Sequence, residues 1–306
     1  MHHIWSHIGY ERKKYLKLTL RGIHLPGNEL VRYNSIYNEL VVDTFKLSWS
    51  NFPDLVSSIS RYSISYLHGY PSLLFEFKEY CAGHGVQFEG LRGIMLGSEG
   101  ATPEEKIALS DFFGCPVISW YGQTEKVILA VDVDTNDRFH IYSSYGYLSL
   151  KDADETGFGE IVGTTFVNKA LPLIKYRTGD YGRLHKGEKS YHLSDIVGRW
   201  GKDFVYLDEN KRIPTASINI HGPIQKELLF YQIHQSEYGK LVYYVHPKKT
   251  ASVSDKEIEK CMAAEMVERL KNFSIEVRIT HNEADIVRSE RGKRIMLVQN
   301  IHINRT

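Results

Sequence analysis

Strand-like and helix-like stretches alternate between residues 40 and 140, and this alternation constrains the fold more than any other feature of the sequence. The expected strands are LVVDTFKLSW (40–49), SYLHGY (65–70), RGIML (92–96) and CPVISW (115–120). Helices are expected between them, because apolar residues there recur at helical spacing. Alternation of this kind predicts a sheet with parallel strands covered by helices.

Start and stop signals bound two of the expected helices. One begins at Pro71 and stops at Gly83 and Gly85, with Leu74, Phe77 and Cys81 on one face. This is the usual arrangement of proline at the start and glycine at the end of a helix. The other helix opens with a capping box, Thr102-Pro103-Glu104-Glu105, and is closed by Gly114. A third helix is expected over residues 51–62.

The pattern changes after Ala130 to short β segments separated by turns. We expect a smaller antiparallel β unit, about 131–198, packed on the α/β layer. The last hundred residues read as strand, strand, helix and strand, with the helix SDKEIEKCMAAEMVERLKNF capped by Ser254 and Glu257. They predict a small, separate α+β domain. The expected domains are therefore 1–198 and 199–306, with the boundary in GRWGKD, and the expected class is α/β with an α+β part.

Composition excludes some classes of partner and site. The chain has 38 basic and 37 acidic residues, a net charge of +1, so no global field favours nucleic acid or anionic lipid. Cys81, Cys115 and Cys261 form no CxxC pair and are expected to be reduced core residues of a cytosolic protein. No run reaches the roughly 18 apolar residues of a membrane span, and MHHIWSHIGYERKK lacks the apolar core of a signal peptide. We therefore expect a cytoplasmic protein.

The stretch WYGQTEK (120–126) places a carboxylate, Glu125, just past an expected buried strand. Open α/β proteins bind ligands at the carboxyl ends of their strands, so Glu125 is a candidate ligand-binding residue. A solvated loop residue is the alternative for any single glutamate.

Polar stretches interrupt the pattern at five places: LGSEGA (96–101), YGQTE (121–125), YRTGDYG (176–182), VGR (197–199) and RGKR (291–294). In this order and at these distances the set resembles the adenylate-forming ligase superfamily. HGYPSLL and FYQIHQ are further features that resemble its phenylacetate-CoA-ligase-like and CapK-type capsule-biosynthesis branch. The resemblance implies a truncated large adenylate-forming domain with mixed sheets, followed by a small C-terminal α+β lid domain.

The resemblance also implies a nucleotide site. Tyr121, beside Gly122, matches the residue that lies against adenine, and a flat aromatic face suits that role. Gly97, Ser98 and Glu99 match the segment along the adenine edge; an ordinary strand-to-helix turn is the alternative. Asp180 matches the carboxylate that accepts hydrogen bonds from both ribose hydroxyls, and a turn carboxylate is its alternative. Arg199 matches the hinge arginine on the ribose or phosphate side.

Three further positions concern the phosphates and the reaction. Thr124 matches a hydroxyl that contacts phosphate, and Glu125 matches a carboxylate that helps to hold Mg²⁺, which prefers oxygen ligands. Lys293 matches the lid lysine that reaches the substrate carboxylate and the α-phosphate during adenylation. A solvated basic cluster is the alternative for Lys293, since Arg288, Arg291 and Arg294 lie nearby in the sequence.

The sequence departs from the family in two places. A phosphate-binding loop of the SSGTTGxP kind is not found, because GSEGATP (97–103) belongs to the adenine-edge position and GFGEIVGTT (157–165) reads as a turn and a strand. MHHIWSHIGYERKKY is expected to be the helix that follows this loop, so the chain is expected to begin after the first part of the large domain. The hinge also differs: relatives commonly read GRxDD, whereas this chain reads GRWGKD.

Two functions follow as expectations. One is an ATP- and Mg²⁺-dependent ligase that adenylates a small carboxylate and transfers the acyl group to CoA or to an amine, such as a sugar amine in surface-polysaccharide assembly. The other is a non-catalytic or partner-dependent AMP/ATP-binding protein that lacks the phosphate clamp. A third interpretation is a degraded or misannotated open reading frame, with the loop encoded in the DNA upstream of it. A second chain or a second copy is expected to cover apolar surface left by the missing part.

Overall fold

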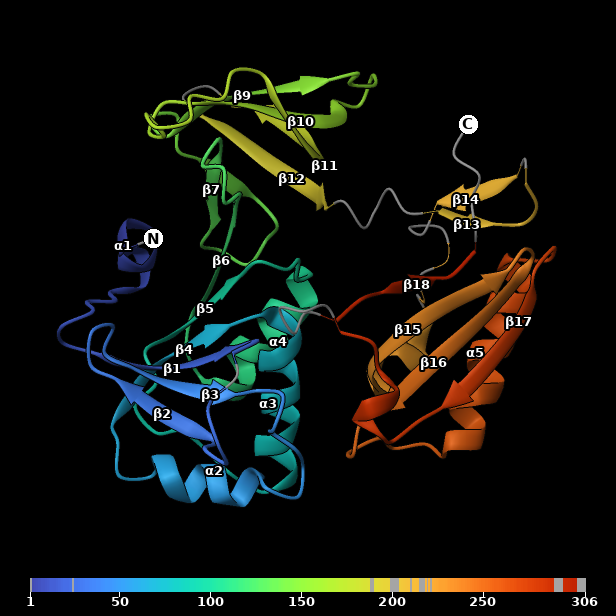
Figure 1. The fold of residues 1–306 in the computed structure, drawn as a ribbon, viewed down its shortest axis with the longest axis horizontal. Helices are drawn as coiled ribbons and strands as arrows, with labels where there is room; N and C mark the ends of the chain where they lie inside the picture. Colours follow the sequence, from blue (N-terminus) through green and yellow to red (C-terminus); the bar gives the residue numbers. More distant parts are fainter. Residues whose placement is uncertain are drawn as a thin grey trace. The chain divides into compact units, whose positions relative to one another are not determined.

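The computed structural model describes residues 2–23, 25–187, 190–198, 204–209, 211–214, 218, 220, 222–288 and 294–301. Contacts between Cα atoms divide the chain into two compact units, Met1–Gly198 and Arg199–Thr306. The large unit contains a continuous sheet, and the small unit contains a sheet of its own (Figure 1). Each unit is described by itself below.

The large unit begins with two short helices, α1 (His2–Trp5) and η1 (Ser6–Ile8). The single helix expected for this stretch is wrong, because the chain turns at Gly9, whose φ of 75° is left-handed. Twelve strands then form one sheet within the described residues, in the order β2-β3-β1-β4-β5-β6-β7-β8-β12-β11-β10-β9. They are β1 (Leu16–Arg21), β2 (Val31–Asn34), β3 (Glu39–Asp43), β4 (Ile64–Gly69), β5 (Gly93–Gly97), β6 (Val117–Gly122), β7 (Leu129–Asp132), β8 (Phe139–Ile141), β9 (Gly146–Lys151), β10 (Phe158–Thr165), β11 (Tyr176–Lys186) and β12 (Tyr191–Val197).

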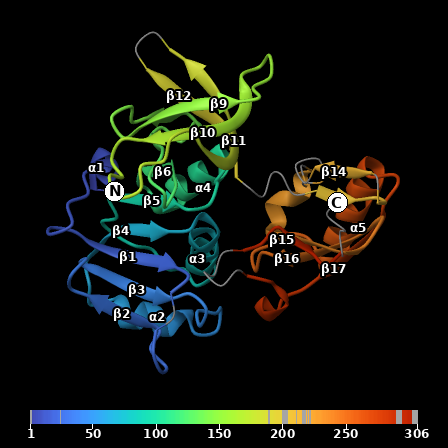
Figure 2. The same cartoon turned by 45° about the horizontal axis from the view of Figure 1, so that its top comes forward.

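The first half of the sheet confirms the predicted α/β layer. β3, β1, β4, β5 and β6 pair in parallel, and β2 joins β3 in the antiparallel direction at one edge. The helices α2 (Phe52–Ile59), α3 (Pro71–Gly83) and α4 (Pro103–Phe113) pack against it (Figure 2). The predicted capping box of α4 is present, and Gly114 closes the helix with a left-handed φ of 63°. The proline start of α3 is confirmed as well.

One predicted strand is shorter than expected. Residues 40–49 were expected to be extended, but β3 ends at Asp43. The buried Asp43 carboxylate accepts hydrogen bonds from the backbone N–H groups of Phe45 and Lys46, at 3.1 and 3.3 Å. Asp side chains commonly end a strand in this way, because they bond to the backbone a few residues further on.

The antiparallel strands extend the same sheet rather than packing on it. β7 pairs with β6 in the antiparallel direction, β8 with β7, and β12 with β8, followed by β11, β10 and β9. The antiparallel character expected after Ala130 is confirmed, but its packing on the α/β layer is wrong. Pairing along the β6 edge satisfies backbone groups that a separate layer would leave open.

The two faces of the parallel strands carry different cores, because side chains alternate along each strand. Leu67, Ile94, Leu96 and Val117 lie in the cluster that includes the residues of α2, α3 and α4. Tyr66, Met95 and Ile118 lie in the opposite cluster, with Ile4 and Trp5 of α1. The N-terminal helix therefore covers the face of the sheet away from α3 and α4.

The small unit combines a mixed four-stranded sheet, in the order β17-β16-β15-β18, with one longer helix. Its elements are β13 (Phe204–Tyr206), β14 (Arg212–Pro214), η4 (Pro223–Glu227), β15 (Leu228–Glu237), β16 (Lys240–Pro247), α5 (Asp255–Arg269), β17 (Ser274–Ile279), η5 (Glu283–Asp285) and β18 (Leu297–Gln299). The predicted order of strand, strand, helix and strand is confirmed, with β18 and the β13-β14 pair in addition. The Ser254 hydroxyl accepts from the Glu257 N–H and caps α5 as expected.

The core of the small unit lies between α5 and the sheet. Ile258, Met262 and Met266 recur every four residues on α5 and are completely buried against strand residues such as Tyr243. Cys261, on the same helix, is exposed, so the expectation of a core residue is wrong for this cysteine. Cys81 and Cys115 are buried, as expected. No described helix is long and apolar enough to span a membrane.

Candidate functional site

Three parallel strands of the large unit end at the same edge of the sheet. Gly69 of β4 lies opposite Leu96 of β5, and Gly97 of β5 lies opposite Trp120 of β6. The polar stretches that follow β5 and β6 therefore lie side by side. Ligands of open α/β sheets bind outside the carboxyl ends of such strands.

The residues expected at adenine and ribose contact each other directly. The Tyr121 hydroxyl, at the end of β6, donates a hydrogen bond to Oδ2 of Asp180 on β11, at 2.9 Å. Burial, and then the negative charge of Asp180, raise the pKa of Tyr121 well above its ordinary value. The phenol is therefore a neutral donor at physiological pH. Thr178 supports the same turn, because its hydroxyl accepts from the Asp180 N–H at 3.0 Å and donates to the Ile161 carbonyl at 2.8 Å.

A second contact joins the same two motifs. The Tyr176 hydroxyl donates to Oε1 of Glu125 at 2.9 Å, and the Asn168 amide donates to the Glu125 backbone carbonyl at 3.2 Å. YGQTE and YRTGD, far apart in sequence, are thus joined both at Tyr121–Asp180 and at Glu125–Tyr176. Between the two contacts, the Gln123 side chain accepts from the Ile128 N–H at 3.2 Å and closes the turn.

The turn leaves the candidate phosphate and metal groups accessible. Thr124 and Gly122 are exposed, and Glu125 is half-buried. Among the described residues, Tyr176 is the side chain that hydrogen-bonds to the Glu125 carboxylate, and it contacts Oε1 alone. Glu125 Oε2 is therefore free to approach a cation. No group of three or more His, Cys, Asp or Glu side chains in the described ranges is placed to hold a metal ion. One carboxylate still fits Mg²⁺, which is commonly held by one or two carboxylates together with nucleotide phosphates.

Gly97 leaves space for the indole ring of Trp120 on the neighbouring strand. A Cβ atom at Gly97 would lie 2.1 Å from Cζ2 of Trp120, so the indole ring occupies the space that a side chain would need. Ser98, with a φ of 71°, turns the chain out of β5, and its hydroxyl accepts from Arg21 at 3.3 Å. Glu99 accepts from the Ser72 N–H at 3.2 Å, in the first turn of α3. The side chains of Ser98 and Glu99 thus join the end of β5 to β1 and α3.

Sequence reasoning missed two residues at this edge, Arg21 and His68. Arg21 ends β1, and its guanidinium lies 5.2 Å from the centre of the Tyr70 ring. His68 is buried between Trp5 and Trp120, with ring centres 5.0 and 5.9 Å away. Burial, then the charges of Arg21 and Lys17, lower the pKa of His68 well below its ordinary value. Both residues lie at or next to the last position of a parallel strand, and this was the signal that could have found them.

Arg199 and Lys293 lie outside the described residues, as do Trp200, Gly201, Lys202 and Asp203 of the hinge motif. Their roles therefore rest on the sequence. Of the other expected site residues, the structure brings Tyr121 together with Asp180 and places Glu125 and Thr124 in the adjoining turn. Gly97, Ser98 and Glu99 follow on the neighbouring strand.

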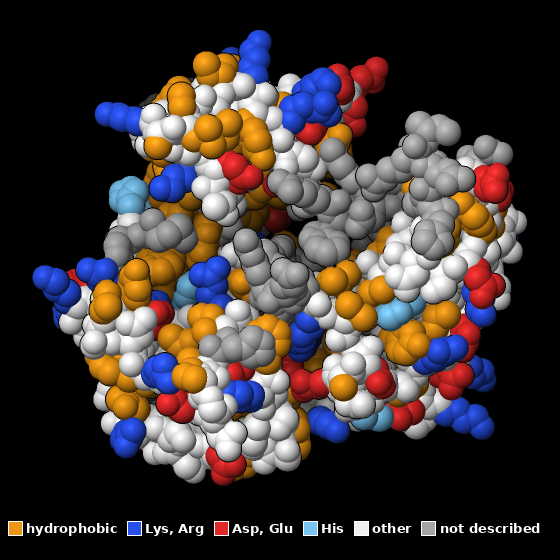
Figure 3. Space-filling view, viewed as in Figure 1, with side chains coloured by type: hydrophobic (Ala, Val, Ile, Leu, Met, Phe, Trp, Pro, Cys, Tyr) orange, Lys and Arg blue, Asp and Glu red, His pale blue; other side chains and the backbone are white. Residues whose placement is uncertain are grey.

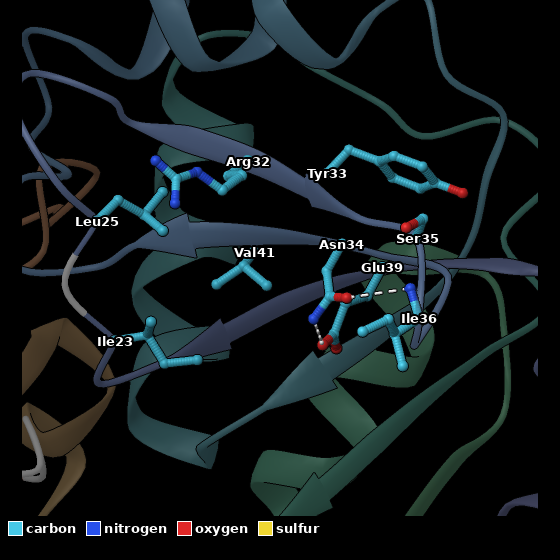
Figure 4. A pocket seen from close by; sticks show the side chains of 9 residues that line it. All are labelled: Ile23, Leu25, Arg32, Tyr33, Asn34, Ser35, Ile36, Glu39 and Val41. Carbon is cyan, nitrogen blue, oxygen red and sulfur yellow. Dashed lines mark hydrogen bonds between the residues drawn. The ribbon is translucent and has the colours of Figure 1, made fainter.

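A shallow groove of about 420 Å³ lies elsewhere, at the far edge of the sheet. Ile23, Tyr33, Ile36 and Val41 line it together with Glu39, which Asn34 contacts at 3.3 Å (Figure 4). β3 and β1 separate this edge strand, β2, from the ends of β4, β5 and β6. The groove is therefore distinct from the candidate site.

Hydrophobic side chains also reach the surface at the other end of the sheet. Figure 3 shows them over the β9–β12 part of the large unit. The exposed side chains of this part include Tyr147, Phe166, Val167, Leu171 and Ile174. Most of them lie in the loop between β10 and β11, which also carries the Asn168 contact to Glu125.

No protein-family model matches the sequence, and no curated protein matches it. Solved structures do match. A 2-hydroxyisobutyryl-CoA ligase, in the postadenylation state in complex with R3-HIB-AMP, superposes with a TM-score of 0.69 at 15% identity, over 97% of this chain and 67% of that chain. For the anthranilate CoA ligase AuaEII in complex with anthranoyl-AMP, the TM-score is 0.56 at 13% identity, over 92% of this chain and 58% of that chain.

A third match extends the comparison beyond CoA ligases. The amide bond synthetase McbA from Marinactinospora thermotolerans superposes with a TM-score of 0.55 at 12% identity, over 94% of this chain and 62% of that chain. The chain thus spans about two thirds, or somewhat less, of the length of these proteins. Over the residues that superpose, the fold of this chain is that of these two CoA ligases and the amide bond synthetase.

Proposed function

We propose that the protein adenylates a small carboxylate with ATP and passes the acyl group to a thiol or an amine. The observation that carries the proposal is the pair of contacts between YGQTE and YRTGD, Tyr121 to Asp180 and Glu125 to Tyr176. They bring together, at the strand ends, the Tyr121 ring, the Asp180 carboxylate proposed to bind ribose and the Glu125 carboxylate proposed to bind Mg²⁺. The fold that carries them is shared with adenylate-forming ligases.

Each residue of the candidate site has a proposed role in binding the nucleotide. The Tyr121 ring lies against adenine while its hydroxyl orients Asp180, and the Asp180 carboxylate accepts the ribose hydroxyls. Gly97, Ser98 and Glu99 line the adenine edge, with Gly122 beside Tyr121 and Arg199 on the ribose or phosphate side. These roles are the ones that the sequence resemblance implies. All of these residues except Arg199 lie within the described part of the structure.

The chemistry is a displacement at phosphorus followed by acyl transfer. A carboxylate oxygen of the substrate attacks the α-phosphorus of ATP, pyrophosphate leaves, and an acyl-adenylate forms. The acceptor thiol or amine then attacks the acyl carbon, AMP leaves, and the acceptor loses one proton. Thr124 contacts phosphate and Lys293 stabilises the negative charge that develops during the first step. Mg²⁺, when bound to Glu125 and the phosphates, supplies further neutralisation of that charge.

The acceptor belongs to the proposal as well. The solved neighbours include CoA ligases and an amide bond synthetase, so both CoA and an amine are candidates. The motif set and the FYQIHQ strand favour the phenylacetate-CoA-ligase-like and CapK-type branch, and with it a sugar amine in surface-polysaccharide assembly. A second chain or a second copy that covers exposed apolar surface is part of the same proposal.

Carboxylate-dependent exchange of labelled pyrophosphate into ATP tests the adenylation step. We expect exchange with at least one member of a broad carboxylate panel, and its loss in Asp180→Ala and Lys293→Ala. The control is Asp154→Ala, which removes an exposed turn carboxylate. A folded protein that shows no exchange with any carboxylate would refute the proposed reaction.

A nucleotide-binding protein without catalysis is the second candidate. It is favoured by the Tyr121–Asp180 hydrogen bond, which joins the two residues proposed to contact adenosine and involves none of the residues proposed to act on the phosphates. It predicts that AMP binds about as tightly as ATP, with or without Mg²⁺. Tighter binding of ATP that depends on Mg²⁺, measured by calorimetry, would remove this candidate.

A further inference from the structure

Strand β11 carries a bulge where it passes β10, within the YRTGD motif. The register of the two strands shifts between Glu160 and Val162, so that residues 178–180 of β11 lie opposite Ile161 alone. Inside the bulge Gly179 has a left-handed φ of 78°, which glycine adopts without strain. A bulge interrupts the ladder of backbone hydrogen bonds and turns a side chain in a new direction, and bulges are frequent next to functional sites.

The Thr178 hydroxyl supplies hydrogen bonds where the bulge interrupts the ladder. It donates to the Ile161 carbonyl at 2.8 Å and accepts from the Asp180 N–H at 3.0 Å. The Thr178 side chain is only 1% exposed, so water has no access to take its place. Because buried backbone groups need partners, this one hydroxyl serves a carbonyl of β10 and an N–H of β11 together.

The bulge also determines where the Asp180 carboxylate lies. Its Oδ2 accepts from the Tyr121 hydroxyl of β6 at 2.9 Å, although β7, β8 and β12 separate β6 from β11 in the order of the sheet. Burial and the charge of Asp180 raise the pKa of Tyr121, while the nearby Thr178 hydroxyl lowers it. Asp180 is therefore held twice, by Thr178 at its backbone and by Tyr121 at its carboxylate.

A protein group that is already held in its binding orientation gives more affinity, because less freedom is lost when the ligand binds. We propose that Thr178 is a positioning residue, whose hydroxyl holds Asp180 in the orientation that receives the two ribose hydroxyls of the nucleotide. This inference rests on the proposed function, because that function gives Asp180 its ribose contact. It adds a residue that acts through Asp180 and not on the nucleotide itself.

Two substitutions separate the hydroxyl of Thr178 from its methyl group. Thr178→Val keeps the shape of the side chain and removes the hydroxyl, whereas Thr178→Ser keeps the hydroxyl and removes the methyl group. Thr19→Val is the matched control in the same sheet. Thr19 is 2% exposed, and its hydroxyl donates to Oε2 of Glu39 at 2.8 Å, a contact that does not involve Asp180.

Calorimetry on the whole chain compares AMP with 2′,3′-dideoxy-AMP, which lacks both ribose hydroxyls. We expect Thr178→Val to lower AMP affinity by about fivefold or more and dideoxy-AMP affinity by less than about twofold. Thr178→Ser and Thr19→Val should each change AMP affinity by less than about twofold. In an Asp180→Ala background, Thr178→Val should cause no further loss, because it acts through Asp180. Equal losses for the two nucleotides, equal losses in the valine and serine variants, or a further loss without the Asp180 carboxylate would overturn the inference.

Hydrogen exchange separates this inference from the proposed function. The Asp180 amide is expected to exchange at least about tenfold faster in Thr178→Val and at an unchanged rate in Thr178→Ser. Unchanged protection of this amide in Thr178→Val would refute the backbone anchor, whatever the affinity for AMP. If wild type binds AMP no more tightly than dideoxy-AMP, the ribose contact of the proposed function fails and the role of Thr178 in binding fails with it. Exchange of the Asp180 amide then still decides whether Thr178 holds this part of the backbone.

Discussion

The Tyr121 hydroxyl and the Asp180 carboxylate are joined by a 2.9 Å hydrogen bond between the end of β6 and β11. The bond uses one of about four acceptor positions on the carboxylate. It also fixes the direction in which the carboxylate points. The two motifs that the sequence separates are therefore pre-organised as one site.

Replacement of Asp180 is expected to weaken the binding of adenosine nucleotides strongly. Asp180→Asn removes the charge from the proposed ribose contacts, so AMP affinity should fall by about tenfold or more. Tyr121→Phe keeps the ring and loses only the orienting hydroxyl, so a smaller decrease is expected. Isothermal titration calorimetry with AMP measures both, and Asp154→Asn is the control. If AMP binds Asp180→Asn as tightly as wild type, Asp180 does not contact the ribose.

Glu125 is expected to matter for ATP and not for AMP. Glu125→Gln keeps the size of the side chain and its contact with Tyr176 but removes the charge that attracts Mg²⁺. The Mg²⁺ concentration needed for half-maximal ATP binding should rise about tenfold, while AMP affinity changes by less than about twofold. Titrations of ATP binding against Mg²⁺ provide the measurement. A parallel loss of AMP affinity would indicate a structural role for the Glu125–Tyr176 contact instead.

Local signals in the sequence predicted α3 and α4 well. The α4 capping box at Thr102 and the proline start of α3 involve residues a few positions apart, and such short-range hydrogen bonds and backbone preferences are visible in the sequence. The end of β3 at Asp43 was not predicted. The Asp43 carboxylate accepts hydrogen bonds from the Phe45 and Lys46 N–H groups, but in the sequence Asp43 lies within an apolar run that reads as a longer strand. The pairing of β7 with β6 was missed because it depends on long-range contacts.

The candidate site was predicted in part. The ordered motifs indicated that Tyr121, Glu125 and Asp180 belong to one site, and the structure brings Tyr121 to Asp180. The contact between Gly97 and Trp120 was not predicted, because the sequence does not show that the Trp120 ring folds across the neighbouring strand. Arg21 and His68 carry no motif, and only strand order places them at the same edge.

Gly97 should tolerate no side chain. In Gly97→Ala the new Cβ would lie 2.1 Å from Trp120 Cζ2, so the indole or β5 must shift inside a close-packed core. A destabilisation of about 1–3 kcal/mol is expected, with a change in tryptophan fluorescence. Gly100→Ala is the control, since a Cβ atom at Gly100 would meet nothing within 4 Å. Denaturant unfolding measures both, and equal stability of the two variants would show that Trp120 moves away without cost.

His68 should make stability depend on pH. The pKa of His68 in the folded protein lies well below its ordinary value. As the pH falls, the unfolded chain therefore binds a proton at His68 before the folded chain does. The stability contributed by the neutral ring is present above about pH 6.5 and is lost as pH falls below it. The unfolding free energy of wild type minus that of His68→Phe should therefore fall by up to about 1.4 kcal/mol per pH unit below pH 6.5. A difference that stays constant between pH 7.5 and 5 would contradict a buried neutral His68.

Lys106 and Asp132 form a buried ion pair that connects α4 to the end of β7. The Nζ–Oδ2 distance is 2.5 Å, and both side chains are almost completely buried. Asp132 also accepts from the N–H groups of Asp134 and Asp137, both at 3.2 Å, and so shapes the turn between β7 and β8. Loss of either partner alone leaves a buried charge without compensation.

A single and a double substitution at this pair separate the ion pair from the turn. Lys106→Met should destabilise the fold by about 3–5 kcal/mol, because the Asp132 carboxylate stays buried and unpaired. Lys106→Met with Asp132→Asn removes that charge and keeps an acceptor for the turn, so the double variant should be more stable than Lys106→Met alone. The exposed pair Lys151–Asp152, at 3.6 Å, supplies the control, and Lys151→Met should cost less than about 1 kcal/mol. Urea unfolding monitored by circular dichroism measures wild type and the three variants. If Lys106→Met costs no more than Lys151→Met, the carboxylate reaches water in the folded protein and α4 is held to β7 by its apolar contacts alone.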